Sequence, residues 1–379
     1  MKNNFFLNGL NELRAIAALS VVYHHIEVHN GLDSFCKKYS FMTYFTGNLG
    51  KNGVFLFFVL SGFLITYLLL KEKQTTGTIA LKKFFFRRIY RIWPLYYLVF
   101  LVSVIVIPLL AVNFEIFKED SFSYSHIVNT HNYGFKGLIL YLFLMPNLAL
   151  YSGYFIIGFS QAWSVGVEEQ FYIIWPLFIL LFNKRRIIQI FFSILILFSV
   201  FIPLAKNDYF IYPFSVIIKS IPFQFMAIGS IGGYFFFYKN HIIKKYTKSK
   251  TAYFFLICLI VIFLFYPILI DDIQALTLSF LFLFLILFSI NDENYWVFKN
   301  QYFSYLGKIS FGIYMYHTLV MFLVFPIVHK YYLNLEKSFH YNLLLYSLIF
   351  ILTILFSSLS YKYFESKYIK IKDSKFKAL

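Results

Sequence analysis

Charged residues and cysteines are both scarce in this sequence of 379 residues. Only 13% of the residues are Asp, Glu, Lys or Arg, whereas 60% are hydrophobic. This composition is too apolar for a soluble globular domain and is typical of a polytopic membrane protein. The two cysteines, Cys36 and Cys258, are too few for a disulfide framework or a metal set, and we expect no metal cofactor.

Signals for processing, repetition and flexible linkers are also absent. The N-terminal segment MKNNFF lacks a cleavable signal with a small-residue cleavage site, so we expect Leu10–His29 to be retained as the first span. No fixed-period repeat or low-complexity linker is visible, which predicts one membrane domain over residues 1–379. The net charge of +17 is explained better by basic loops on one side of a lipid bilayer than by a nucleic-acid partner, which we do not expect.

Apolar runs of spanning length recur along the whole chain and predict an all-α, polytopic membrane helix bundle. About ten transmembrane helices are expected, near residues 10–29, 50–70, 88–111, 165–182, 187–204, 213–238, 252–270, 273–290, 309–328 and 341–362. A shorter apolar piece, Leu138–Leu150, is interrupted by Pro146 and is expected to be a re-entrant or interfacial segment on the outer side.

The basic residues predict the orientation of the bundle. If the N-terminus is cytoplasmic, 25 of the 34 Lys and Arg residues fall in cytoplasmic segments, so we expect both termini in the cytoplasm. This topology places His25 and Glu168 about one helical turn, roughly 6 Å, below the outer boundary. Arg14, Arg88 and Arg91 then lie near the cytoplasmic ends of their spans.

The first predicted span carries one arginine, Arg14, and two adjacent histidines, His24 and His25. Arg14 and His25 are 11 residues apart, so they share one helix face and lie roughly 16 Å apart along the axis. His25 is a candidate general base in an outer cavity, since its pKa in water is close to neutral. The alternative is structural, with the histidine bonded to a neighbouring helix and Arg14 extended to the interface. His24 is expected to be structural.

Two further arginines, Arg88 and Arg91, open the third predicted span on a shared face. Two planar guanidinium groups suit a phosphate or pyrophosphate. The alternative is ordinary positive-inside charge that contacts anionic lipid.

Glu168 and Glu169, in the segment QAWSVGVEEQFYIIWPL at 161–177, are the only acidic residues well inside the second to tenth predicted spans. Glu168 shares a face with Ser164 and Tyr172, and a histidine on a facing helix is its expected partner. We expect His25 in that role, and expect Glu169 to face another span or a capping contact. The alternative is a helix start at which Ser164 is the N-cap and the glutamate favours the helix dipole.

Two other motifs stand out, one for its polar side chains and one for its glycines. In SFGIYMYH at 310–317, His317 lies near one stripe with Ser310 and Tyr314, and a packing network is the alternative to a substrate site. In the segment at 50–66, Gly50, Gly53 and Gly62 are expected to allow close helix approach, which is a structural role.

Taken in order, these motifs resemble those of the integral-membrane acyltransferase family 3, which includes O-acetyltransferases of bacterial O-antigen, exopolysaccharide and nodulation factor. The resemblance rests on Arg14–x10–His25, FFVLSGFLIT at 57–66, Arg88–x–x–Arg91, WSVGVEEQFY at 163–172 and SFGIYMYH at 310–317. It implies a ten-span fold, acetyl-CoA as cytoplasmic donor and a sugar hydroxyl as acceptor. It also implies an essential catalytic His25, with Arg14, Arg88 and Arg91 supporting donor binding.

The sequence therefore predicts an O-acyltransferase, most simply an acetyltransferase, of the bacterial inner membrane. Its partners are acetyl-CoA and a hydroxyl of an envelope glycan or lipid-linked sugar. The predicted catalytic residues are His25 and Glu168, and the predicted substrate-binding residues are Ser164, Tyr172 and His317. Direct transfer and a covalent acetyl-histidine relay both remain open. The alternative function is a transporter or flippase for a lipid-linked sugar, with the same polar residues lining a path.

Overall fold

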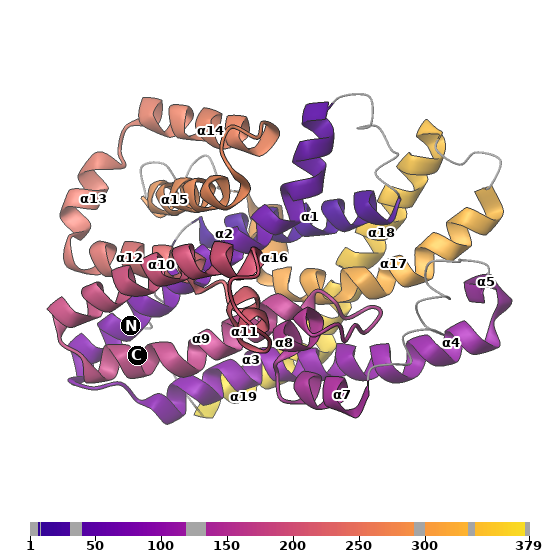
Figure 1. Ribbon diagram of the computed structural model, residues 1–379, viewed down its shortest axis with the longest axis horizontal. Coiled ribbons are helices and arrows are strands. Elements are labelled where there is room, and N and C mark those ends of the chain that lie inside the picture. Colours follow the sequence, from indigo (N-terminus) through magenta and orange to yellow (C-terminus); the bar gives the residue numbers. More distant parts are fainter. Residues whose placement is uncertain are drawn as a thin grey trace.

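The computed structural model describes residues 7, 9–30, 40–118, 134–291, 300–332 and 338–375, and these residues form helices without a strand. The prediction of an all-α bundle is confirmed. In chain order, the helices are α1 (Leu10–His29), α2 (Ser40–Thr76), α3 (Leu81–Leu101), η1 (Val102–Val106), α4 (Ile107–Asn113), α5 (Glu115–Lys118), α7 (Gly134–Leu142), α8 (Pro146–Tyr151), α9 (Ala162–Leu181), α10 (Lys184–Lys206), α11 (Phe214–Ser220), α12 (Phe223–Tyr238), α13 (Asn240–Tyr246), α14 (Lys250–Phe265), α15 (Asp271–Ser289), α16 (Gln301–Lys308), α17 (Ser310–Tyr332), α18 (Phe339–Ser360), η4 (Tyr361–Glu365) and α19 (Ser366–Lys375). Figure 1 shows the longer helices running side by side along the long axis of the molecule.

Seven of the described helical segments are long and apolar enough to cross a membrane, and up to nine if each of two bent pairs is one span. The bent pairs are α11 with α12, at 41°, and α13 with α14, at 82°. Together with α1 they make the ten segments that the sequence predicts. The bounds of α1 coincide with the predicted first span, but its ionisable residues, among them Glu12, Arg14 and Glu27, make it too polar to qualify by composition.

The outward faces of the bundle carry large apolar side chains, as contact with lipid requires. On α10, Ile196 is 63% exposed, and on α14, Phe254 and Phe255 are 63% and 61% exposed. A soluble protein of this size would bury such a surface. The chain is therefore a multi-pass membrane protein.

The centre of the bundle is α2, which packs against α1, α9, α12, α14 and α15. Its closest approach is to α12, where a Cβ atom on Gly62 would lie 2.0 Å from the main-chain oxygen of Met226. A Cβ atom on Gly229 of α12 would likewise lie 2.0 Å from the main-chain oxygen of Val59. The structural role expected for Gly62 is confirmed, because only glycine permits this crossing of the two backbones.

The predicted re-entrant piece consists of the two short helices α7 and α8, and α8 begins at Pro146. The side-chain amides of Asn147 and Gln170 donate to each other over 3.1 and 3.0 Å, which joins α8 to α9. Gly166 provides the space, since a Cβ atom there would lie 2.7 Å from Asn147 and Pro146. The first turns of α9 are therefore covered by α8 and do not form an open end of the bundle.

We predict that Gly229→Ala destabilises the protein by about 1–3 kcal/mol, because the new methyl group must overlap backbone rather than a flexible side chain. Thermal unfolding in detergent measures the effect. Gly47→Ala in α2 is the matched control, since nothing lies within 4 Å of its Cβ position. Equal stability of the two variants would contradict the close crossing of α2 and α12.

Candidate active site

A cavity of about 680 Å³, counting its open mouth, lies among α1, α2, α3, α9 and α17. Its wall is polar and basic on one side and aromatic on the other. The residues that line it are Arg14, Phe57, Ser61, Arg88, Arg91, Ile92, Ser164, Val165, Glu168, Tyr172, Ser310, Phe311 and Tyr314. We call it the arginine cavity. It brings together most of the predicted site residues, from five separate helices.

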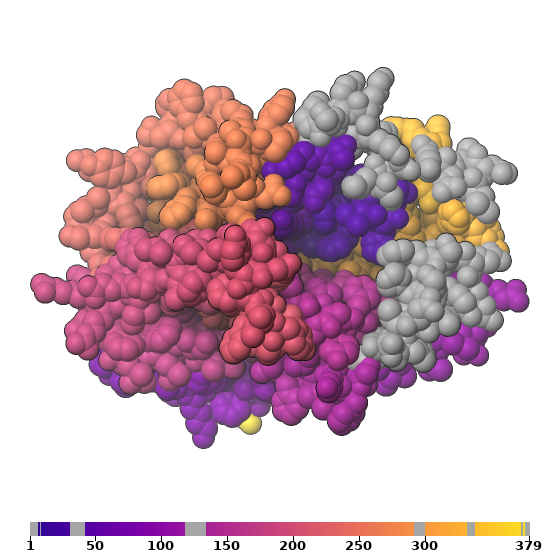
Figure 2. Space-filling model, viewed as in Figure 1, coloured from indigo at the N-terminus to yellow at the C-terminus, as the bar shows by residue number. Residues whose placement is uncertain are grey.

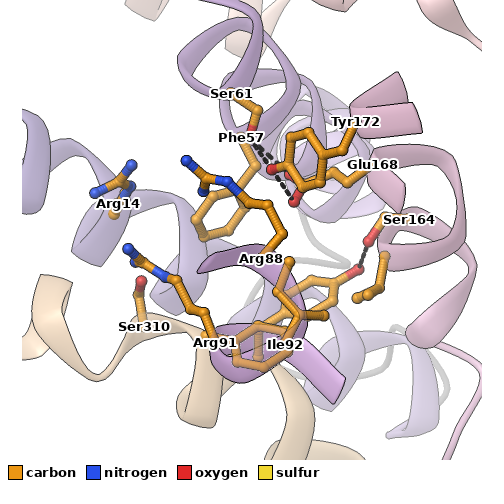
Figure 3. Close-up of a pocket in the computed structure, with 13 residues that line it drawn as sticks. Arg14, Phe57, Ser61, Arg88, Arg91, Ile92, Ser164, Glu168, Tyr172 and Ser310 are labelled. Atoms are coloured by element: carbon orange, nitrogen blue, oxygen red, sulfur yellow. Dashed lines mark hydrogen bonds between the residues drawn. The ribbon is translucent and has the colours of Figure 1, made fainter. Parts of the chain in front are cut away.

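Three guanidinium groups converge on the arginine cavity, as Figure 3 shows. Arg14 comes from the first turns of α1, and Arg88 and Arg91 come from α3. The guanidinium of Arg88 lies over the ring of Tyr172, 5.2 Å from its centre, and this contact fixes its direction. Within the described ranges, none of the three forms an ion pair.

The neighbouring arginine, Arg87, is held differently. Its Nη2 lies 3.3 Å from the Glu72 carboxylate, which also accepts the main-chain N–H of Ala80 at 2.9 Å. This contact ties the end of α2 to the start of α3. It therefore orients α3 so that Arg88 and Arg91 face the cavity while Arg87 does not.

The carboxylate of Glu168 lies in the same cavity, with both oxygens bonded to neutral hydroxyl groups. Ser61 donates to Oε1 at 2.8 Å, and Tyr172 donates to Oε2 at 2.9 Å. The predicted shared face of Glu168 and Tyr172 is confirmed by this bond. With three cationic side chains and one carboxylate, the cavity wall carries an excess of positive charge and is suited to an anion.

The expected hydrogen bond between Glu168 and His25 is absent, because the carboxylate of Glu168 accepts hydrogen bonds from Ser61 and Tyr172 instead. The physical reason is the position of α9. The prediction placed Glu168 at the level of His25, but its carboxylate lines the arginine cavity, whose described wall does not include His25. Glu169 meets the expectation of facing another span, because it accepts the indole N–H of Trp93 on α3 at 3.1 Å.

Ser164 is not an N-cap, because α9 begins at Ala162 with Gln161 in the capping position. Its hydroxyl instead lies 2.6 Å from the hydroxyl of Tyr314, which donates to the main-chain oxygen of Gln161 at 2.9 Å. This contact between α9 and α17 forms one end of the arginine cavity. The sequence shows the two side chains but not their contact, since 150 residues separate them.

Beyond Tyr314, α17 carries His317, which is fully buried and contacts His25. The atoms His317 Nε2 and His25 Nδ1 are 3.2 Å apart, and the two rings are 4.9 Å apart between centres. His25 Nδ1 also lies 2.9 Å from the main-chain oxygen of Val21. We call His25 and His317 the histidine pair.

His24 touches the edge of the His25 ring, with 5.2 Å between the ring centres, but its hydrogen bond is to another helix. Its Nδ1 lies 2.6 Å from the main-chain oxygen of Thr46 on α2, and its ring fills the space beside Gly50. The contact with α2 is the structural role expected for it. Among the described residues, no three His, Cys, Asp or Glu side chains gather closely enough to hold a metal ion.

One residue and one contact of the site escaped the sequence analysis. Ser61 was taken as part of a structural glycine motif, although it is one of two hydroxyl side chains in FFVLSGFLIT, with Thr66, and a hydroxyl in an apolar span was the available signal. The pairing of His317 with His25 had no signal in a single sequence, because the two residues are 292 positions apart.

Comparison with known proteins agrees with this geometry. A family model described as an acyltransferase domain (Acyl_transf_3) matches residues 7–362. The chain belongs to this acyltransferase family. No solved structure matches it.

Several curated relatives are O-acetyltransferases by name. A Staphylococcus aureus protein named "Putative O-acetyltransferase" is 28% identical over 96% of this chain and 58% of its own length. The peptidoglycan O-acetyltransferase OatA of Listeria monocytogenes is 30% identical over 47% of this chain and 25% of its own length. The O-acetyltransferase OatA of Staphylococcus aureus is 29% identical over half of this chain. The chain thus spans 58% of the length of the Staphylococcus aureus relative that it matches over 96% of its own sequence.

Proposed function

We propose that this protein is a membrane O-acyltransferase that moves an acetyl group from acetyl-CoA to a hydroxyl of an envelope glycan or lipid-linked sugar. Membership of the acyltransferase family supports acyl transfer, and the names of the relatives support an O-acetyl product on a glycan. The observation that carries the proposal is the convergence of Arg14, Arg88 and Arg91 on one cavity, whose wall includes the Tyr314 that contacts His317.

The arginine cavity is the proposed donor site. The phosphates of CoA are multiply charged, and planar guanidinium groups bind phosphate oxygens through paired N–H donors. Arg14 and Arg88 are half-buried without a carboxylate in direct contact, which is costly, so a bound anion would relieve both, and the exposed Arg91 adds a third guanidinium to the same cavity. The cavity lies near the starts of α1, α3 and α17, which the predicted topology places at the cytoplasmic side of a bacterial inner membrane.

His25 is the proposed general base. It lies three helical turns from Arg14 along α1, so α1 runs from the arginine cavity to the histidine pair. Helix α17 does the same, with Ser310 in the cavity wall and His317 in the pair. As general base, His25 takes the proton of the acceptor hydroxyl while the oxygen of that hydroxyl attacks the thioester carbon of the donor. The carbon–sulfur bond then breaks, and the thiolate of CoA leaves and is protonated. If His25 instead carries the acetyl group, the same bond breaks one step earlier.

The other cavity residues have supporting roles in this proposal. Ser164 and Tyr172 contact the thin arm of the donor where it passes between α9 and α17. The catalytic contribution expected of Glu168 becomes indirect, because its carboxylate holds Ser61 and Tyr172 in place and lowers the positive charge near Arg88.

We predict that His25→Ala abolishes acetyl transfer while the protein still folds and inserts. CoA release from acetyl-CoA is measured in proteoliposomes that receive envelope glycan from the source strain. His24→Ala is the matched control and should retain most of the activity, because the hydrogen bond of His24 is to Thr46 on α2 and not to the nitrogen atoms of His25. An active His25→Ala variant would contradict the proposed base, and a wild-type protein that releases no CoA would favour a transporter or flippase.

We predict that Arg88→Ala weakens acetyl-CoA binding by about 1.5–3 kcal/mol, the scale of a hydrogen bond to a charged group. Calorimetry in detergent measures the affinity. Arg88→Lys should restore little of it, because an ammonium lacks the planar pair of donors. Arg87→Ala is the matched control, since Arg87 is paired with Glu72 outside the cavity. Equal losses in Arg87→Ala and Arg88→Ala would indicate a general charge effect and no donor site.

A further inference from the structure

We infer that His317 is a positioning residue for His25, whose ring it holds in the one tautomer that leaves Nε2 free to accept a proton. The inference rests on the proposed role of His25 as general base. It assigns to a second histidine the role that a carboxylate often plays beside a catalytic imidazole.

The tautomer of His317 follows from its own contact within α17. Its Nδ1 lies 2.7 Å from the main-chain oxygen of Tyr314. A carbonyl oxygen carries no proton, so Nδ1 of His317 must donate one. In a neutral ring, the other nitrogen, Nε2, is then an acceptor with a free lone pair.

The tautomer of His25 follows in turn. Its Nδ1 faces two acceptors, the main-chain oxygen of Val21 at 2.9 Å and Nε2 of His317 at 3.2 Å. Both contacts are favourable only if Nδ1 of His25 carries a proton and shares it between them. The remaining nitrogen, Nε2 of His25, is therefore unprotonated. It forms no hydrogen bond with any of the described residues, and it is the only ring atom of His25 that can act as a base.

The surroundings make His317 suited to this task. Its ring is fully buried, and Tyr314, which fixes its Nδ1, is itself anchored to Gln161 and Ser164 of the segment before and within α9. The arrangement runs from the wall of the arginine cavity through Tyr314 to His317 and then to His25. When Nε2 of His25 takes the proton of the acceptor hydroxyl, its Nδ1–H becomes a stronger donor, and the bond to His317 stabilises the cation that forms.

A carboxylate is usually found beside a catalytic histidine, but none of the described Asp and Glu residues forms a hydrogen bond with His25. Glu168 is bonded to Ser61 and Tyr172, and Glu169 to Trp93. Glu27, one turn from His24 on α1, is bonded to Tyr346. His317 is thus the side chain that directs His25.

Three variants test the inference by CoA release in proteoliposomes with envelope glycan. His317→Leu removes the acceptor, and kcat should fall by roughly two orders of magnitude, while KM for acetyl-CoA stays unchanged because the arginine cavity is intact. His317→Gln offers an amide oxygen to Nδ1 of His25 and should recover at least about tenfold of that loss. His24→Gln should leave kcat near the wild-type value, because His24 touches only the edge of the His25 ring and makes its hydrogen bond to Thr46.

A spectroscopic measurement separates this inference from the proposed function, because it needs no turnover. In protein with ¹⁵N-labelled histidine, the nitrogen signals of His25 should show a protonated Nδ1 and an unprotonated Nε2, and His317→Leu should allow the other tautomer to appear. A wild-type His25 protonated at Nε2, or a His317→Gln variant that is folded but no better than His317→Leu, would overturn the inference. Loss of activity in His25→Ala together with either result would leave the proposed function standing.

Discussion

The rest of the site depends on three guanidinium groups that line one cavity of the helix bundle, whose described wall holds one carboxylate, that of Glu168. Removing a cation from water is costly unless a partner of opposite charge or several hydrogen-bond acceptors replace the water. Glu168 offers its two oxygens to Ser61 and Tyr172, and so it does not pair with Arg14 or Arg88. The arginine cavity therefore favours a polyanion, and its position near the starts of α1 and α3 determines from which end of the bundle the anion enters.

A second constraint is the close packing that holds these charges in place. The crossing of α2 and α12 at Gly62 and Gly229 leaves no room for adjustment at the centre of the bundle. At the end of α2, the bonds from Glu72 to Arg87 and to the N–H of Ala80 fix the start of α3. Lys73 adds a bond from α2 to the last carbonyl groups of α9. These contacts hold the helices that line the arginine cavity, and Tyr314 on α17 connects the cavity wall to the histidine pair.

The sequence predicts the fold well because hydrophobic length is a strong signal in membrane proteins. The bounds of α1 agree with the prediction, and each further predicted span corresponds to a helix or a bent pair of helices. Shared helix faces were also predictable, as the bond of Tyr172 to Glu168 shows. The partners of Glu168 were only partly predictable, because the bond from Ser61 depends on how α9 packs against α2. The pairing of His25 with His317 depends on which helices are neighbours, and neither periodicity nor spacing reveals that. The orientation of the bundle in the membrane stays a prediction.

The central claim is that the arginine cavity holds the phosphates of the donor while its acyl end reaches the histidine pair. A cryo-electron microscopy structure with a non-transferable thioether analogue of acetyl-CoA tests it most directly. The account predicts phosphate density against Arg88 and Arg91, with the sulfur end extending past Tyr314 towards Nε2 of His25. Phosphate density elsewhere on the protein, or an acyl end on the side of α9 away from α1, would contradict it.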